Sequence, residues 1–258
     1  MIKPIKTIRV FFIIIQFIFE SEINIIFSKI TKKEPKNFLK KYSQKMIKTL
    51  NITINLHGMN TDAQSQQTLF VGNHLSYLDV VILSSIYETL FITSKKTENT
   101  FLLGKICKNA QCIFVDRQSR KKAKEEITNV SHRINSKKNI TFFPEATSTN
   151  GDSILNFKRF FFKSAIQSKC KIQTFTLNYL EVNNLKITKE NRDLIFWYGD
   201  MKFFSHFLKI ISLNKIKVEV IFNNPINIKK LKTEENNSHF LSQHTRNQVI
   251  QNYHFIGN

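Results

Sequence analysis

The sequence predicts an α/β domain with a mostly parallel sheet flanked by helices, preceded by an N-terminal membrane-associated helical element. Two observations support this fold class. Short β-prone runs alternate with helical stretches from residue 52 to residue 251. Hydrophobic residues make up 41% of the 258 residues, which is enough apolar material for a packed core. Because no linker interrupts the middle of the chain, we expect residues 1–36 to form the membrane anchor and residues 37–258 one folded domain.

The N-terminal segment is predicted to contact a membrane. Its apolar run, Val10 to Phe19, is shorter than the roughly 20 residues that a spanning helix needs. Basic residues flank it on both sides, which suits a segment that dips into one leaflet and returns to anionic headgroups. We expect a monotopic anchor, with a short spanning helix as the first alternative. A buried core helix is a further possibility, whereas a signal peptide would need a small-residue cleavage site that the following ESEINII lacks.

Strands are predicted where apolar and polar residues alternate or where short β-prone runs are apolar throughout. A basic amphipathic helix over residues 37–50 comes first, and ITINL then alternates as a strand closed by Gly58. The predicted strands are 52–56, 68–71, 90–93, 112–115, 140–143, 172–177 and 217–222. The predicted helices between and after them are 78–86, 101–110, 121–136, 157–169, 202–212 and 239–251. This alternation favours parallel strands, and sites in such sheets collect beyond the carboxyl ends of the strands.

Charge and cysteine content narrow the function classes. Lys and Arg total 39 against 19 Asp and Glu, so the net charge of +20 favours polyanionic partners such as anionic lipid, phosphorylated substrate or nucleic acid. A coding bias towards Ile, Asn and Lys would also produce much of this charge. Three cysteines without a CxxC pair argue against a disulfide framework or structural zinc and favour a reducing, cytosolic setting.

Polar side chains follow three of the predicted strands. After LFVG come Asn73 and His74, with Asp79 five residues beyond the histidine. A carboxylate at that distance, at the start of a helix, can hold one imidazole nitrogen protonated and leave the other as a base. The alternative is that Asp79 only caps the helix, which is worth about 1 kcal/mol.

The second and third polar groups follow the strands at 112–115 and 140–143. Arg117, next to Asp116, has the fork geometry for a phosphate, although an exposed Asp–Arg pair is the simpler interpretation. Pro144 fixes a turn before Glu145, and two hydroxyl side chains follow within the same loop. An ordinary strand exit with a capping hydroxyl would show the same residues.

The order and spacing of the three groups resemble the lysophosphatidic acid acyltransferase (1-acylglycerol-3-phosphate acyltransferase) family, in a bacterial branch. The resemblance is carried by Asn-His-x4-Asp, Phe-Val-Asp-Arg and Phe-Pro-Glu-x-Thr over roughly residues 50 to 225. It implies a glycerolphosphate acyltransferase-like fold and acyl transfer from acyl carrier protein or acyl-CoA to a lysolipid hydroxyl in phospholipid biosynthesis. It also implies no metal and no cofactor beyond the thioester co-substrate. The implied location is the cytoplasmic face of the bacterial inner membrane, with membrane lipids and the acyl donor as partners and no nucleic acid.

By this resemblance His74 is the general base and Asp79 orients it. The other residues at motif positions are expected to bind substrate: Asn73, Arg117, Glu145, Ala146, Thr147 and Ser148. Backbone N–H groups around Glu145–Thr147 are candidates for the oxyanion site.

The third motif departs from the family in two places. The family usually has Gly at position 146 and Arg at position 148, where this chain has Ala146 and Ser148. An alanine there implies a turn near right-handed or extended geometry, or else strain. The lost arginine leaves a different acceptor open, such as a lyso-ornithine lipid. A non-enzymatic basic protein that binds anionic lipid or nucleic acid is the alternative of another class.

Overall fold

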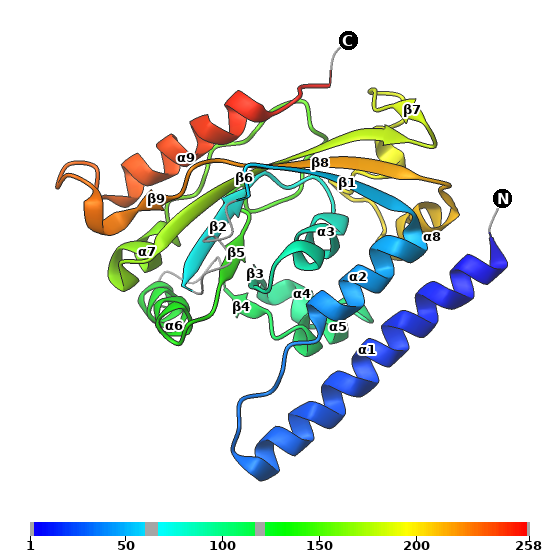
Figure 1. Ribbon diagram of the computed structural model, residues 1–258, viewed down its shortest axis with the longest axis horizontal. Coiled ribbons are helices and arrows are strands. Elements are labelled where there is room, and N and C mark those ends of the chain that lie inside the picture. Colours follow the sequence, from blue (N-terminus) through cyan, green and yellow to red (C-terminus); the bar gives the residue numbers. More distant parts are fainter. Residues whose placement is uncertain (1–2, 60–66, 117–121, 257–258) are drawn as a thin grey trace.

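The computed structural model describes residues 3–59, 67–116 and 122–256. Within these residues the strands form one nine-stranded sheet with the central order β1-β8-β6-β2-β5-β3-β4, and β7 and β9 pair with β6 (Figure 1). The strands are β1 Ile52–His57, β2 Thr68–Gly72, β3 Leu90–Ser94, β4 Ile113–Val115, β5 Ile140–Phe142, β6 Lys171–Val182, β7 Leu185–Lys186, β8 Ile216–Phe222 and β9 Ile226–Asn227. Antiparallel pairing occurs only where β6 meets β7, β8 and β9 among these strands, so the mostly parallel sheet is confirmed.

Helices lie on both sides of this sheet. Figure 1 shows α9 along one face, while α2 and α3 lie on the other side. The helices are α1 Pro4–Thr31, α2 Leu39–Leu50, α3 Leu78–Ile86, α4 Lys95–Glu98, α5 Leu103–Asn109, α6 Ala123–Asn135, α7 Phe162–Ser168, α8 Phe203–Ser212 and α9 Ser238–Asn252, with short 3-10 turns at Arg192–Leu194 and Ile228–Lys230. Coverage on both faces explains why every residue of β2, in the middle of the sheet, is buried. The three cysteines are free thiols.

Two predicted elements differ from the structure by five residues at one end, whereas the other predicted ends differ by at most two. The helix expected over 157–169 begins only at Phe162, because the preceding segment is held by the loop after β5. In that loop Pro144 accepts a hydrogen bond from the Lys158 N–H, and Glu145 accepts one from the Leu155 N–H. The strand expected over 172–177 continues to Val182, since β8 pairs with it along its second half. Both differences come from long-range hydrogen bonds that local sequence patterns do not encode.

The N-terminal segment is one continuous helix of 28 residues, α1, and it does not fold back within the apolar run. The expectation that Val10–Phe19 dips and returns is therefore wrong. The acidic residues that follow the run do not end the helix, because glutamate is a good helix former. Both carboxylates also pair with lysines of the domain. Glu20 pairs with Lys41 at 2.7 Å, and Glu22 pairs with Lys105.

One side of α1 packs on the domain and the other side is exposed. Val10, Ile13, Ile14 and Phe17 are buried, and Phe11 meets Phe207 of α8 edge-on at 6.0 Å. The opposite side carries a stripe of exposed apolar side chains. These are Ile5, Ile8, Phe12, Ile15, Phe19, Ile23, Ile26, Phe27 and Ile30. By length and composition α1 is able to cross a membrane, but its buried side is committed to the rest of the protein.

Candidate active site

The sheet order brings two of the three predicted polar groups together. β2 and β5 are parallel neighbours, so the loops that follow them leave the sheet side by side. β4 lies at the edge, separated from β5 by β3. Of the group that follows β4, Asp116 is described, whereas Arg117 lies outside the residues that the structure describes.

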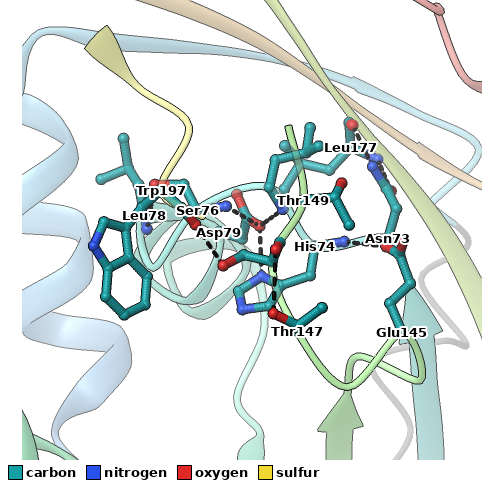
Figure 2. Close-up of polar contacts among 12 residues, drawn as sticks. Asn73, His74, Ser76, Leu78, Asp79, Glu145, Thr147, Thr149, Leu177 and Trp197 are labelled. Atoms are coloured by element: carbon teal, nitrogen blue, oxygen red, sulfur yellow. Dashed lines mark hydrogen bonds and ion pairs between the residues drawn. The ribbon is translucent and has the colours of Figure 1, made fainter. Parts of the chain in front are cut away.

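His74 and Asp79 form the predicted contact. The His74 Nδ1 lies 2.8 Å from the Asp79 Oδ2 (Figure 2). The Asp79 carboxylate is fully buried, whereas 18% of the His74 side chain is exposed. An ionised carboxylate only accepts, so the Nδ1 of His74 carries the proton and the Nε2 is left with its lone pair. The accessible imidazole is thus held in the tautomer that a general base needs.

Asp79 also shapes the loop from which His74 projects. Its Oδ2 accepts hydrogen bonds from the Leu75 N–H at 2.7 Å and the Ser76 N–H at 3.0 Å. The alternative that Asp79 serves as a helix cap is therefore partly right, since this carboxylate in the first turn of α3 does bind N–H groups of the turn before it. The same oxygen that orients His74 ties the loop to α3.

Asn73 was predicted to contact substrate, and the structure corrects this. Its side chain is fully buried, with the Oδ1 accepting from the Leu177 N–H at 2.8 Å and the Nδ2 donating to the Leu177 carbonyl at 2.9 Å (Figure 2). The amide therefore has no surface left for a ligand. It fastens the His74 loop to β6.

Glu145 is likewise a support for the loop rather than an open binding group. It is 3% exposed, and its two oxygens accept the His74 N–H and the Leu155 N–H, each at 2.8 Å. Burial raises the pKa of the Glu145 carboxyl to about 7, although both backbone N–H groups act in the opposite direction. The predicted substrate contact at this position is therefore replaced by a bridge between His74 and the segment after residue 150.

The rest of the third motif divides between a strained turn and a buried hydroxyl. Ala146 has φ +66°, so the turn keeps the left-handed geometry that favours glycine and the alanine is strained. Its N–H donates to the Phe143 carbonyl at 3.0 Å, which removes this group from the candidate oxyanion donors. Ser148 is 9% exposed and donates to the Trp197 carbonyl, so it too is not an open substrate contact. Thr147 is exposed.

A cavity of about 340 Å³ lies one side chain away from the dyad, and neither His74 nor Asp79 lines it. Phe143, which lines it, stacks on the His74 ring with centroids 3.9 Å apart and planes 10° from parallel. The residues that line the cavity are mainly aromatic and aliphatic, and three charged side chains, Asp116, Glu126 and Lys158, lie among them. The lining residues are Ile92, Asp116, Ala123, Glu126, Phe142, Phe143, Pro144, Ala146, Lys158, Phe160 and Phe161. A mainly apolar cavity with a few charged groups suits an amphiphilic ligand.

Several residues that build the site had no signal in the sequence. Leu177 and Trp197 act through backbone atoms, which any residue type provides. Tyr179 donates to Asp79 from a position 100 residues away in the chain. Only the pairing of β6 with β2 brings it there. In the described part of the chain, no group of three or more His, Cys, Asp or Glu side chains is placed to hold a metal ion.

The sequence is similar to known acyltransferases. The family model described as Acyltransferase matches residues 53–178, which include the loops after β2, β4 and β5. The chain is 29% identical over 154 residues to 1-acyl-sn-glycerol-3-phosphate acyltransferase of Neisseria gonorrhoeae, covering 60% of this chain and 58% of that protein. It is 20% identical over 207 residues to lyso-ornithine lipid O-acyltransferase of Rhizobium meliloti, covering 78% and 70%.

The fold has a solved counterpart. The crystal structure of the 1-acyl-sn-glycerophosphate acyltransferase PlsC from Thermotoga maritima superimposes with a TM-score of 0.66 over 96% of this chain and 95% of that one. The sequence identity is 14%, so this likeness concerns the fold alone. The chain spans 58% of the length of the Neisseria relatives that it matches.

Proposed function

We propose that the chain is a member of the lysophosphatidic acid acyltransferase family and a membrane-bound O-acyltransferase that acylates the free hydroxyl of a lysolipid, on the support of the Acyltransferase family model and the similar acyltransferases. The acceptor we favour is 1-acyl-sn-glycerol-3-phosphate, which would become phosphatidic acid in phospholipid biosynthesis. The donor would be a thioester, acyl carrier protein or acyl-CoA. The observation that carries the proposal is the His74–Asp79 pair at 2.8 Å, with the His74 ring stacked on Phe143, which lines a mainly apolar cavity.

The dyad supports direct transfer without an acyl-enzyme. The Nε2 of His74 takes the proton of the acceptor hydroxyl while that oxygen attacks the thioester carbonyl carbon. The tetrahedral intermediate collapses, the C–S bond breaks, and the thiolate leaves with the proton that the imidazolium returns. Asp79 stabilises the transient imidazolium through the Nδ1 hydrogen bond. No metal or other cofactor enters these steps.

The cavity supports the choice of an amphiphilic substrate. Its aromatic residues suit an acyl chain, and Lys158 provides a cation for a phosphate. Arg117 is proposed as a second phosphate ligand on the family motif alone.

A lyso-ornithine lipid is the second candidate acceptor, and one observation favours it. Asp116 and Glu126 both line the cavity. Glu126 accepts the Asp116 N–H at 2.6 Å, and carboxylates in the lining of a ligand cavity favour an acceptor that carries an ammonium group. Ser148, which stands where the family usually has Arg, points the same way, because its hydroxyl is engaged by Trp197 and supplies no charge.

We also propose that the protein lies on the cytoplasmic face of the bacterial inner membrane, where thioester donors are available. Support comes from α1, whose exposed apolar stripe runs along its length opposite the face packed on the domain. A helix fixed on one side and apolar on the other is suited to lie along the bilayer interface. This arrangement is monotopic.

Acyl transfer by purified protein in detergent tests the proposal. Wild type, His74→Ala and His132→Ala would receive labelled acyl-CoA or acyl carrier protein with a panel of lysolipids. His132 is an exposed histidine on α6 and serves as the matched control. We expect turnover in wild type and His132→Ala and its loss in His74→Ala, and the preferred acceptor distinguishes the two candidates. Equal turnover in all three proteins would refute the role of His74, and no turnover with any acceptor would favour a binding protein.

A further inference from the structure

The second oxygen of Asp79 has a partner of its own. The Tyr179 hydroxyl donates to the Asp79 Oδ1 at 2.7 Å, while the Oδ2 serves His74, Leu75 and Ser76. Tyr179 is 6% exposed and Asp79 is fully buried. A buried hydrogen bond between a phenol and a carboxylate is charge-assisted, and such bonds are shorter and stronger than neutral ones.

The length of β6 explains how Tyr179 reaches the dyad. The last residue of β2, Gly72, pairs with Phe175, but β6 runs on past that point to Val182. The overhanging part of the strand therefore lies against the loop that carries His74. Within it, Leu177 binds Asn73 through its backbone, and Tyr179 follows two residues later. The ring is held by Phe196, with centroids 5.5 Å apart.

We propose that Tyr179 is a positioning residue that completes a His74–Asp79–Tyr179 relay, fixing the Asp79 carboxylate and setting how strongly it attracts the His74 proton. This inference rests on the proposed acyl transfer by His74. Without the phenol, the Oδ1 would be a buried carboxylate oxygen without its donor, and the negative charge would concentrate on the carboxylate that faces His74. The imidazole would then hold its second proton more tightly in the resting enzyme.

Tyr179 acts as a donor throughout the accessible pH range. Burial, together with the charge of Asp79, raises the pKa of Tyr179 well above its ordinary value. Other titratable side chains near the dyad are Tyr77 at the start of α3, Glu145 after β5 and Tyr253 after α9. Among these three, burial raises the pKa of Glu145 to about 7 and those of both tyrosines well above 10, so only Glu145 titrates near neutrality. The titration of Glu145 therefore affects the pH profiles of wild type and of a Tyr179 variant alike.

The test compares Tyr179→Phe with Tyr87→Phe and wild type. Tyr87 is also buried, and its hydroxyl binds Thr141 at 3.2 Å, away from the dyad. The Tyr87→Phe variant therefore shows what the loss of a buried hydroxyl does to activity when the dyad is not involved. For Tyr179→Phe we expect kcat to fall about tenfold with KM little changed, because one charge-assisted hydrogen bond is lost. The acid limb of kcat/KM should move to higher pH by about half a unit to one unit. Tyr87→Phe should keep the wild-type profile.

A readout that needs no turnover separates this inference from the proposed function. With ¹⁵N-labelled histidine, the Nδ1–H resonance of His74, assigned by its loss in His74→Ala, should shift in Tyr179→Phe and stay in place in Tyr87→Phe. An unchanged resonance and an unchanged pH profile in folded Tyr179→Phe would overturn the relay. An inactive wild type in which the resonance still shifts would refute the proposed reaction while leaving the relay intact.

Discussion

Replacing Asp79 by Asn or by Ala separates its two duties, orienting His74 and holding the loop. The carboxylate accepts four hydrogen bonds, from His74, Leu75, Ser76 and Tyr179. In Asp79→Asn the amide oxygen can replace the Oδ2 and keep its three donors, and the amide N–H can donate to the Tyr179 oxygen. In Asp79→Ala all four donors lose their acceptor. The two variants therefore share the loss of charge but differ in the number of unsatisfied groups.

The expected magnitudes follow from this count. In Asp79→Ala the buried Leu75 N–H, Ser76 N–H and Tyr179 hydroxyl are left unpaired at about 1–2 kcal/mol each, so the free energy of unfolding should fall by about 3–6 kcal/mol. In Asp79→Asn the fall should be about 1–2 kcal/mol, since neutral hydrogen bonds replace charge-assisted ones. Both variants lose the partner of the imidazolium, so kcat should fall about 10²–10⁴-fold in each.

Urea denaturation followed by circular dichroism, with acyl transfer measured on the same preparations, checks both parts. The control is wild type under identical detergent conditions. An Asn variant that keeps the wild-type rate would refute the orienting role of Asp79. An Ala variant as stable as the Asn variant would refute the assignment of the four hydrogen bonds to stability.

Three further predictions concern the turn, the buried glutamate and α1. Ala146→Gly should raise the free energy of unfolding by about 0.5–1 kcal/mol. The φ of +66° costs an L-residue about 1–2 kcal/mol, and glycine removes this cost but increases the conformational entropy of the unfolded chain, which offsets part of the gain. A lower melting temperature would contradict the strain. Glu145 has a folded-state pKa of about 7 against an ordinary value of 4.5, so the folded protein binds the extra proton and stability falls as pH rises between these values. Glu145→Gln lacks this titration, so its free energy of unfolding relative to wild type should rise by about 3 kcal/mol from pH 4.5 to pH 8. Urea denaturation at several pH values measures this trend. A stability difference that does not change with pH would disprove it. Replacing Phe12, Ile15 and Phe19 together by Ser should weaken co-sedimentation with anionic vesicles while leaving the circular dichroism spectrum unchanged, since these side chains are exposed; undiminished binding would show that the stripe does not contact lipid.

Local pattern accounted for most of the elements. The apolar run of β2 and the alternating KVEVIF of β8 are strands as predicted, because burial on both faces and burial on alternate residues leave distinct patterns. The helix at 157–169 was predicted too long, since the hydrogen bonds that Pro144 and Glu145 make to this segment come from another part of the chain. Likewise, the apolar run Val10–Phe19 predicted a short segment, whereas α1 continues through Glu20 to Thr31, because glutamate is a good helix former and one side of the helix packs on the domain.

By itself the sequence predicted the fold class, the resemblance to the acyltransferase family and the two residues proposed for the chemistry, His74 and Asp79, because a short spacing at a strand end is a local property. Only the tertiary structure showed which motif residues have their polar groups hydrogen-bonded within the protein. Asn73, Glu145 and Ser148 carry functional groups of the right type, yet their hydrogen bonds to Leu177, Leu155 and Trp197 use them within the protein. Tyr179 became part of the site because β6 is longer than β2, and the relative length of two strands far apart in sequence is set by packing of the whole sheet.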